Sequence, residues 1–155
     1  MRPTALIGML ALGLALGSIV LGHLILVPAL QGDTSLVDAN LARALAQPLS
    51  LRTAELALAA CVVLTAVAKH WLRHNAAASL ALLAAGIAGV DRLGILPRAH
   101  EAWSRVDLVA MRPQVRIDAA EQLWMIHEAT LAALAVVLLA LAAFASTAKP
   151  KSRSE

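Results

Sequence analysis

The most constraining feature of the sequence is an uncharged apolar run near its beginning, since no Asp, Glu, Lys or Arg occurs between Pro3 and Gly32. An α-helix needs about 20 apolar residues to cross the hydrocarbon core of a bilayer. A cleaved signal peptide is the alternative because Arg2 precedes the run, but the apolar part of a signal covers only about 7–15 residues. We therefore predict a retained membrane-spanning helix over about residues 4–30.

The composition of the whole chain agrees with a helical membrane protein. Of its 155 residues, 60% are apolar and 15% are charged, whereas soluble domains average about 45–50% and about 25%. The strong helix formers Ala and Leu occur 35 and 30 times. Cys61 is the one cysteine of the sequence, so we expect no intramolecular disulfide, no dithiol redox chemistry and no thiolate zinc site.

Three further apolar stretches have the length and the boundaries of spanning helices. Pro97 is expected to end the middle one, because proline cannot donate to the hydrogen-bond ladder of a helix. The pattern Asp118-x-x-Glu121 is typical of a helix start and precedes the last one. The three predicted spans cover about residues 53–72, 76–96 and 119–145.

These four spans predict an all-α fold, an integral membrane antiparallel four-helix transmembrane bundle. We expect a single domain over residues 1–148, followed by a basic tail at 149–155. The connections at 31–50 and 98–117 contain apolar residues at helical spacing, which indicates a short interfacial helix in each.

Four spans place both termini on one face of the membrane, here called the terminal side, and the two long connections on the other, the loop side. Six Lys and Arg residues fall on the terminal side, where the polar segments are short. Seven fall on the loop side, where the connections are longer. Cytoplasmic segments are enriched in Lys and Arg close to the spans. The sequence therefore favours a bacterial inner (plasma) membrane protein with both termini in the cytoplasm.

Each predicted span carries one ionisable residue at a similar depth, very roughly 5–9 Å inside its loop-side end at about 1.5 Å per residue. Such residues usually face the bundle interior or a water-filled cavity. Two imidazoles and two carboxylates could ligate a transition metal such as copper, two imidazoles alone could clamp a haem iron, and the set could relay protons. A hydrogen-bonded cluster that only fixes helix register is the structural alternative. The four candidates are His23, Glu55, Asp91 and His127.

The other histidines and tryptophans have simpler interpretations. His70 and His74 share a helix face, but their basic neighbours and Trp71 favour anchoring at the membrane edge. His100 is expected to be solvated in the connection that follows the third span. Trp124 is expected in the belt of aromatic residues at the membrane interface.

Small residues recur four positions apart in two of the spans, at Gly13 and Gly17 and at Ala85 and Gly89. Such steps let membrane helices approach closely. We expect them to pack inside the bundle, with a dimer interface as the alternative.

Three short motifs resemble a known group of proteins. Residues 22–30 read GHLILVPAL, residues 96–98 read LPR, and residues 121–127 begin the last span. Together they resemble small four-span membrane proteins of the copper-resistance-D-like type and their eukaryotic relatives linked to platinum-drug resistance. The resemblance implies metal handling or membrane stress tolerance, and it would carry over His127 as a functional residue.

The function expected from the sequence is that of a non-enzymatic membrane protein with a polar histidine and carboxylate site near one leaflet. No Ser/His/Asp or Cys/His arrangement at a common depth indicates a hydrolase. An accessory subunit of a larger membrane complex, a homo-oligomer and a bis-histidine haem protein are the alternatives. The lipid bilayer is the predicted partner, and no feature points to nucleic acid.

Overall fold

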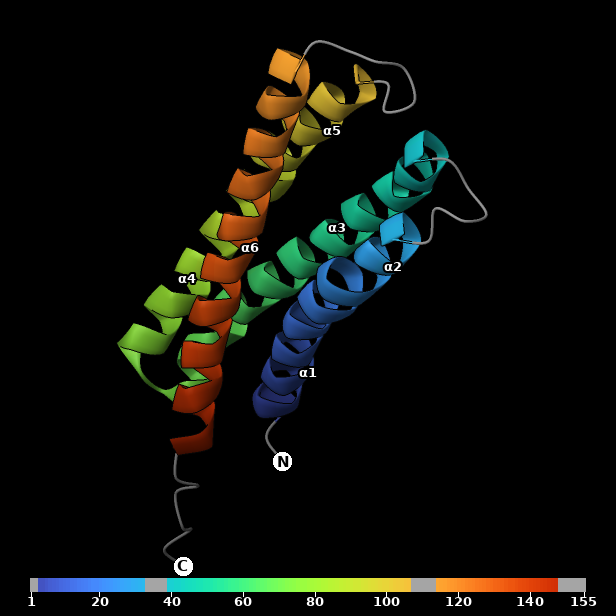
Figure 1. Cartoon of the computed structure of the whole chain (residues 1–155). Helices are drawn as coiled ribbons and strands as arrows, with labels where there is room; N and C mark the ends of the chain where they lie inside the picture. The colour runs from blue at the N-terminus through green and yellow to red at the C-terminus, as the bar shows by residue number, and fades with distance from the viewer. Residues whose placement is uncertain (1–2, 33–38, 107–113, 148–155) are drawn as a thin grey trace, which may run out of the picture.

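The computed structural model describes residues 3–32, 39–106 and 114–147, and nearly all of these residues are helical. Four helices are long and apolar enough to cross a membrane, and they run alternately in opposite directions (Figure 1). The prediction of an all-α four-helix membrane bundle is therefore confirmed. In chain order the helices are α1 (Pro3–Gly17), continued by η1 (Ser18–Leu26) and α2 (Val27–Gly32); α3 (Ala39–Leu72); α4 (Asn75–Val90), continued by η2 (Asp91–Ile95) and α5 (Leu96–Ser104); and α6 (Gln114–Thr147).

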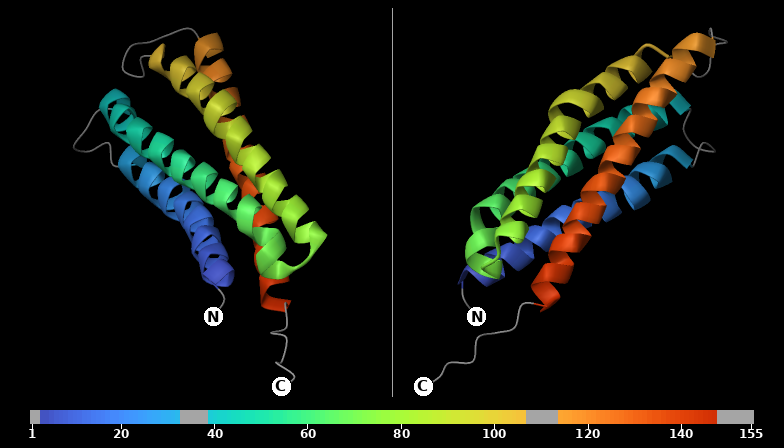
Figure 2. Two further views of the ribbon diagram at one scale, coloured as in Figure 1. Left: turned by 180° about the vertical axis from the view of Figure 1, so that it is seen from behind. Right: turned by 90° about the vertical axis from the view of Figure 1, so that its left-hand side faces the viewer.

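The helices form two arms that diverge toward the loop side (Figure 2). The first arm pairs α1, η1 and α2 with α3, and the second pairs α4, η2 and α5 with α6. Packing of α3 against α4 joins the arms. Only Arg73 and His74 separate these two helices, and Arg73 adopts the left-handed φ of 55° that allows so tight a turn. His74 then caps α4, since its Nδ1 accepts the Ala76 N–H at 3.2 Å.

The terminal-side half of the bundle is a close-packed apolar core. Trp71 at the end of α3 lies over Gly8 of α1, where an added Cβ would come within 2.2 Å of the indole ring. Many core residues are alanines, whose small side chains let the helix backbones approach closely. The buried core consists of Ala11, Leu12, Ala15, Ile19, Ala60, Cys61, Leu64, Ala68, Ala77, Ala81, Ala84, Ala88, Leu134, Leu138 and Leu141.

Prolines near the loop side lie inside long helices and do not end them. The prediction that Pro97 ends the third span is wrong, because the helix continues through η2 into α5. The residues before Pro28 and Pro97 donate their N–H groups five positions back, Val27 to Gly22 and Leu96 to Asp91. This wider, π-helical turn accommodates a proline ring that would clash with the carbonyl four positions back. In a bilayer, a continuous helix also keeps the backbone groups paired.

The predicted interfacial helices are not separate elements. Residues 39–50 form the first turns of α3, which continues unbroken through Pro48. This proline is exposed, so the carbonyl that it leaves without a donor is not forced into the bundle core. Residues 98–104 continue the third helix as α5. Of the two connections, residues 33–38 and 107–113 lie outside the described residues.

The first small-residue step does not pack inside the bundle. An added Cβ at Gly13 or Gly17 would have no neighbouring heavy atom within 4 Å, so the expectation of internal packing is wrong for this step. The reason is rotation, because α1 meets α3 through the face that carries Gly8 and Ala15. In the second step, a Cβ at Gly89 would lie 3.9 Å from Leu58 and therefore faces the bundle.

Candidate functional site

A fully buried histidine–carboxylate pair lies between η2 and α6. His127 Nδ1 is 2.6 Å from Asp91 Oδ1, and the two residues are 0% and 2% exposed. A carboxylate accepts hydrogen bonds, so the hydrogen of the imidazole stays on Nδ1. The other ring nitrogen, Nε2, is buried and has no hydrogen-bond partner in the described part of the chain. Asp91 thus orients the ring, and in the neutral imidazole the lone pair is on Nε2.

A second imidazole lies directly beside this pair. The rings of His23 and His127 meet edge to face, with centroids 5.0 Å apart and an interplanar angle of 66°. His23 belongs to η1, and its Nε2 is 3.1 Å from the Thr53 hydroxyl of α3. That hydroxyl also lies 3.0 Å from the Ser50 carbonyl. When its single hydrogen goes to that carbonyl, His23 Nε2–H donates to Thr53, and His23 Nδ1 keeps its lone pair.

Glu55 does not join the histidines, although it lies at a similar depth. Its carboxylate is paired with Arg92 at 2.7 Å and with Arg52 at 2.8 Å, and its side chain is 39% exposed. The buried face of α3 at this level carries Ser50, Thr53 and Ala54. A one-residue step on a helix turns a side chain by about 100°, which takes Glu55 off that face. The structure therefore brings together three of the four predicted residues, without Glu55.

His100 and Trp124 extend the cluster toward the loop side. His100 is 8% exposed, so the expectation that it is solvated is wrong. Its Nε2 lies 3.0 Å from the Ser50 hydroxyl, and its ring stacks on Trp124 at 6.1 Å and 15°. Trp124 also lies 5.2 Å from the His127 ring. The sequence contains the signal for His100, because a helix that continues through Pro97 places it four residues after buried Leu96.

His70 and His74 lie at the turn between α3 and α4, at the opposite end of the bundle from this cluster. His74 caps α4, and its ring lies 5.5 Å from Phe144, while His70 is exposed at the end of α3. Both therefore lie outside the buried cluster, and their anchoring at the membrane edge stays a prediction.

The buried cluster offers fewer side-chain ligands than a complete metal site usually has. Within the described part of the chain, no three His, Cys, Asp or Glu side chains are arranged to hold one metal ion. Asp91 is already paired with His127, so the nitrogens that remain for a ligand between the two contacting rings are His127 Nε2 and His23 Nδ1. A haem does not fit between these rings, because a porphyrin held by two histidines lies between them and here the rings are in contact.

Comparison with known proteins adds no relative. No protein-family model, no curated protein and no solved structure matches this chain. The function is therefore inferred from the residues of the chain itself.

Proposed function

We propose that this integral membrane protein binds a transition-metal ion between His23 and His127. The observation that carries the proposal is the His127 ring. It is fully buried and its Nδ1 contacts Asp91, while its Nε2 has no partner and its ring touches a second imidazole. An unpaired polar atom in such a place costs about 1–3 kcal/mol, and a metal ion would satisfy it.

The chemistry of the cluster supports a metal over a purely structural role. Metal-bound histidines commonly donate their second N–H to a carboxylate, which fixes the ring and raises its basicity. Asp91 stands in that relation to His127, so it would support the ligand from behind. Neutral imidazole suits Cu, Zn, Fe and Ni. Copper is the first ion to test, because the resemblance to copper-resistance-D-like proteins implies metal handling.

Metal loading of purified variants tests this proposal. The detergent-solubilised protein is stripped of metal, loaded with copper or zinc, desalted and analysed for bound metal per chain. We expect stoichiometric binding that falls in acid, since protons compete for both imidazoles, and loss of binding in His127→Ala. The control is His70→Ala, which removes an exposed histidine. Equal binding by His127→Ala and the unmodified protein would show that the site is wrong.

We further propose that the protein lies in a bacterial inner membrane with both termini in the cytoplasm. The support is the denser Lys and Arg content of the terminal side. A C-terminal alkaline phosphatase fusion should be inactive, and a C-terminal green fluorescent protein fusion should be bright. The opposite pair of results would place the termini outside the cytoplasm.

An accessory subunit of a larger complex is the second candidate function. The face of Gly13 and Gly17 supports it, because a Cβ added at either glycine would meet no heavy atom of another described element within 4 Å and such steps favour contact with another helix. The native mass in mild detergent distinguishes the candidates, since a subunit should migrate with partners that Gly13→Leu releases. A protein that migrates as a single chain before and after this change would rule out the second candidate.

A further inference from the structure

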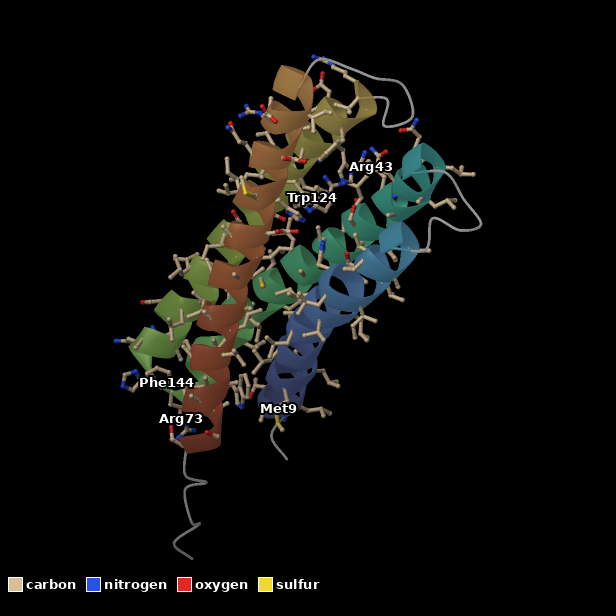
Figure 3. All side chains as sticks on the ribbon, viewed as in Figure 1. Met9, Arg43, Arg73, Trp124 and Phe144 are labelled. Carbon is tan, nitrogen blue, oxygen red and sulfur yellow. The ribbon has the colours of Figure 1, made fainter. Side chains whose placement is uncertain are left out.

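A cavity of about 590 Å³ opens between the two arms, on the loop side of the histidine cluster. Its size falls in the range of about 300–1,000 Å³ that is typical of small-molecule sites. Figure 3 shows Arg43 on α3 and Trp124 on α6, both between the arms. The lining includes Arg43, Gln47, Ser50, His100, Trp103 and Trp124.

Two buried polar atoms of the lining residues have no hydrogen-bond partner among the residues that the structure describes. They are Arg43 Nη1 and His100 Nδ1, and they come from α3 and α5. A guanidinium is always charged and only donates hydrogen bonds, so Arg43 requires an acceptor. No Asp or Glu is among the described residues that line the cavity. A second lining arginine, Arg105, is paired with Glu101. The described part of the lining therefore carries an excess of positive charge near Arg43.

Two tryptophans give the cavity flat apolar walls. The Arg43 guanidinium lies 3.8 Å above the centre of the Trp103 ring, a cation–π contact that positions the group and leaves its charge in place. On the neighbouring helix α6 of the same arm, Trp124 stacks on His100. A molecule in the cavity thus meets aromatic surface and unpaired donors together.

We infer that this cavity binds a small anionic amphiphile, a molecule with one carboxylate or phosphate group and an apolar body. The anionic group contacts Arg43 and His100, and the apolar body lies against Trp103 and Trp124. An acceptor at His100 Nδ1 selects the tautomer that carries the hydrogen there, in which the Ser50 hydroxyl donates to Nε2. The inference does not depend on metal binding, because it uses none of the residues His23, Asp91 and His127.

Tryptophan quenching by a brominated fatty acid tests the inference. In Trp71→Phe protein the two remaining tryptophans both line the cavity. In an uncharged detergent, 9,10-dibromostearate should quench their fluorescence saturably, whereas its methyl ester should not. Arg43→Gln should weaken this quenching by about tenfold, the worth of one charge-assisted hydrogen bond. Arg43→Lys should retain part of it, and Arg98→Gln, which changes an exposed arginine of α5, should retain all of it.

Competition then identifies the source of the anion. Displacement of the probe by phosphatidylglycerol but not by benzoate or inorganic phosphate assigns a membrane lipid, and the reverse result assigns a soluble acid. Quenching by the methyl ester equal to that by the acid would overturn the inference. So would unchanged quenching in an Arg43→Gln protein whose thermal unfolding matches that of the control.

Discussion

Gly22 brings η1 close enough to α3 for the His23 ring to reach Thr53. An added Cβ at Gly22 would lie 2.5 Å from Thr53 Cγ2 and 2.7 Å from its Cβ. Neither atom is the end of a long flexible chain, so the two helices would have to separate. The hydrogen bond between His23 and Thr53 depends on this close approach.

Gly22→Ala should therefore disturb both the packing and the proposed metal site. We expect a loss of about 1–3 kcal/mol of stability from overpacking, seen as a lower midpoint of thermal unfolding in detergent, together with weaker metal binding. Gly17→Ala is the matched control in the same long helix, because a Cβ there meets no atom within 4 Å. Equal unfolding midpoints for the two variants would contradict the proposed role of Gly22.

Asp91→Asn should weaken metal binding without unfolding the bundle. The amide has a similar size and can still accept a hydrogen bond from His127 Nδ1, but it lacks the charge that raises the basicity of the imidazole. Changes in such supporting residues typically lower metal affinity by about 10- to 100-fold. A competition titration against a chelator of known affinity measures the change, with Glu55→Gln as the control because Glu55 lies outside the cluster. An unchanged affinity in Asp91→Asn would remove Asp91 from the site.

The depth of each residue could be predicted from the sequence, but its rotation could not. Matched depth correctly grouped His23, Asp91 and His127. It wrongly added Glu55, because depth does not say which helix face a residue occupies. The burial of His100 does not follow from the sequence for a different reason, since a proline such as Pro97 predicts the end of a helix that in the structure continues.

The two π-helical segments, η1 and η2, are the elements that set this rotation. Each lies in a long helix and contributes one residue to the cluster, His23 from η1 and Asp91 from η2. A wider turn changes the angular phase of all residues beyond it, so an ideal period of 3.6 residues fails to predict which residues share a face. Such segments are often found at functional sites.

Pro97→Ala should separate stability from binding. Alanine can donate its N–H and removes the ring clash, so the wide turn at η2 can relax toward an α-helix. We expect an equal or higher unfolding midpoint together with weaker metal binding, because Asp91 turns away from His127. Pro48→Ala is the control, since that proline is exposed in a helix without a π-helical segment. Unchanged metal affinity in Pro97→Ala would show that the wide turn is not needed.

The whole molecule combines a tight half and an open half. The terminal-side half is filled by alanine and leucine side chains, whereas the arms diverge on the loop side around the cavity (Figures 1 and 2). Local opening is easier where fewer apolar contacts must be broken.

The rate of amide hydrogen exchange should therefore differ between the terminal-side and loop-side halves of the bundle more than between one helix and another. In detergent, amides at 57–68 and 134–141 should exchange more slowly than those at 41–50 and 97–104, by about tenfold or more. Mass spectrometry of proteolytic fragments measures this exchange. Within the first arm it compares 57–68 with 41–50, and within the second arm it compares 134–141 with 97–104. Uniform exchange along α3 would contradict this division.

The packed apolar core of the terminal-side half also determines from which side of the membrane an ion could reach the histidine cluster. Between the histidine cluster and the terminal side lies packed aliphatic core, which insulates the site from that face of the membrane. An ion held by His23 and His127 would exchange only with the solution on the loop side. Its occupancy would report the concentration in that one compartment, whatever the gradient across the bilayer. If the proposed ion binds, this conformation would make the protein a one-sided receptor or store, and net flux would require the two arms to rearrange.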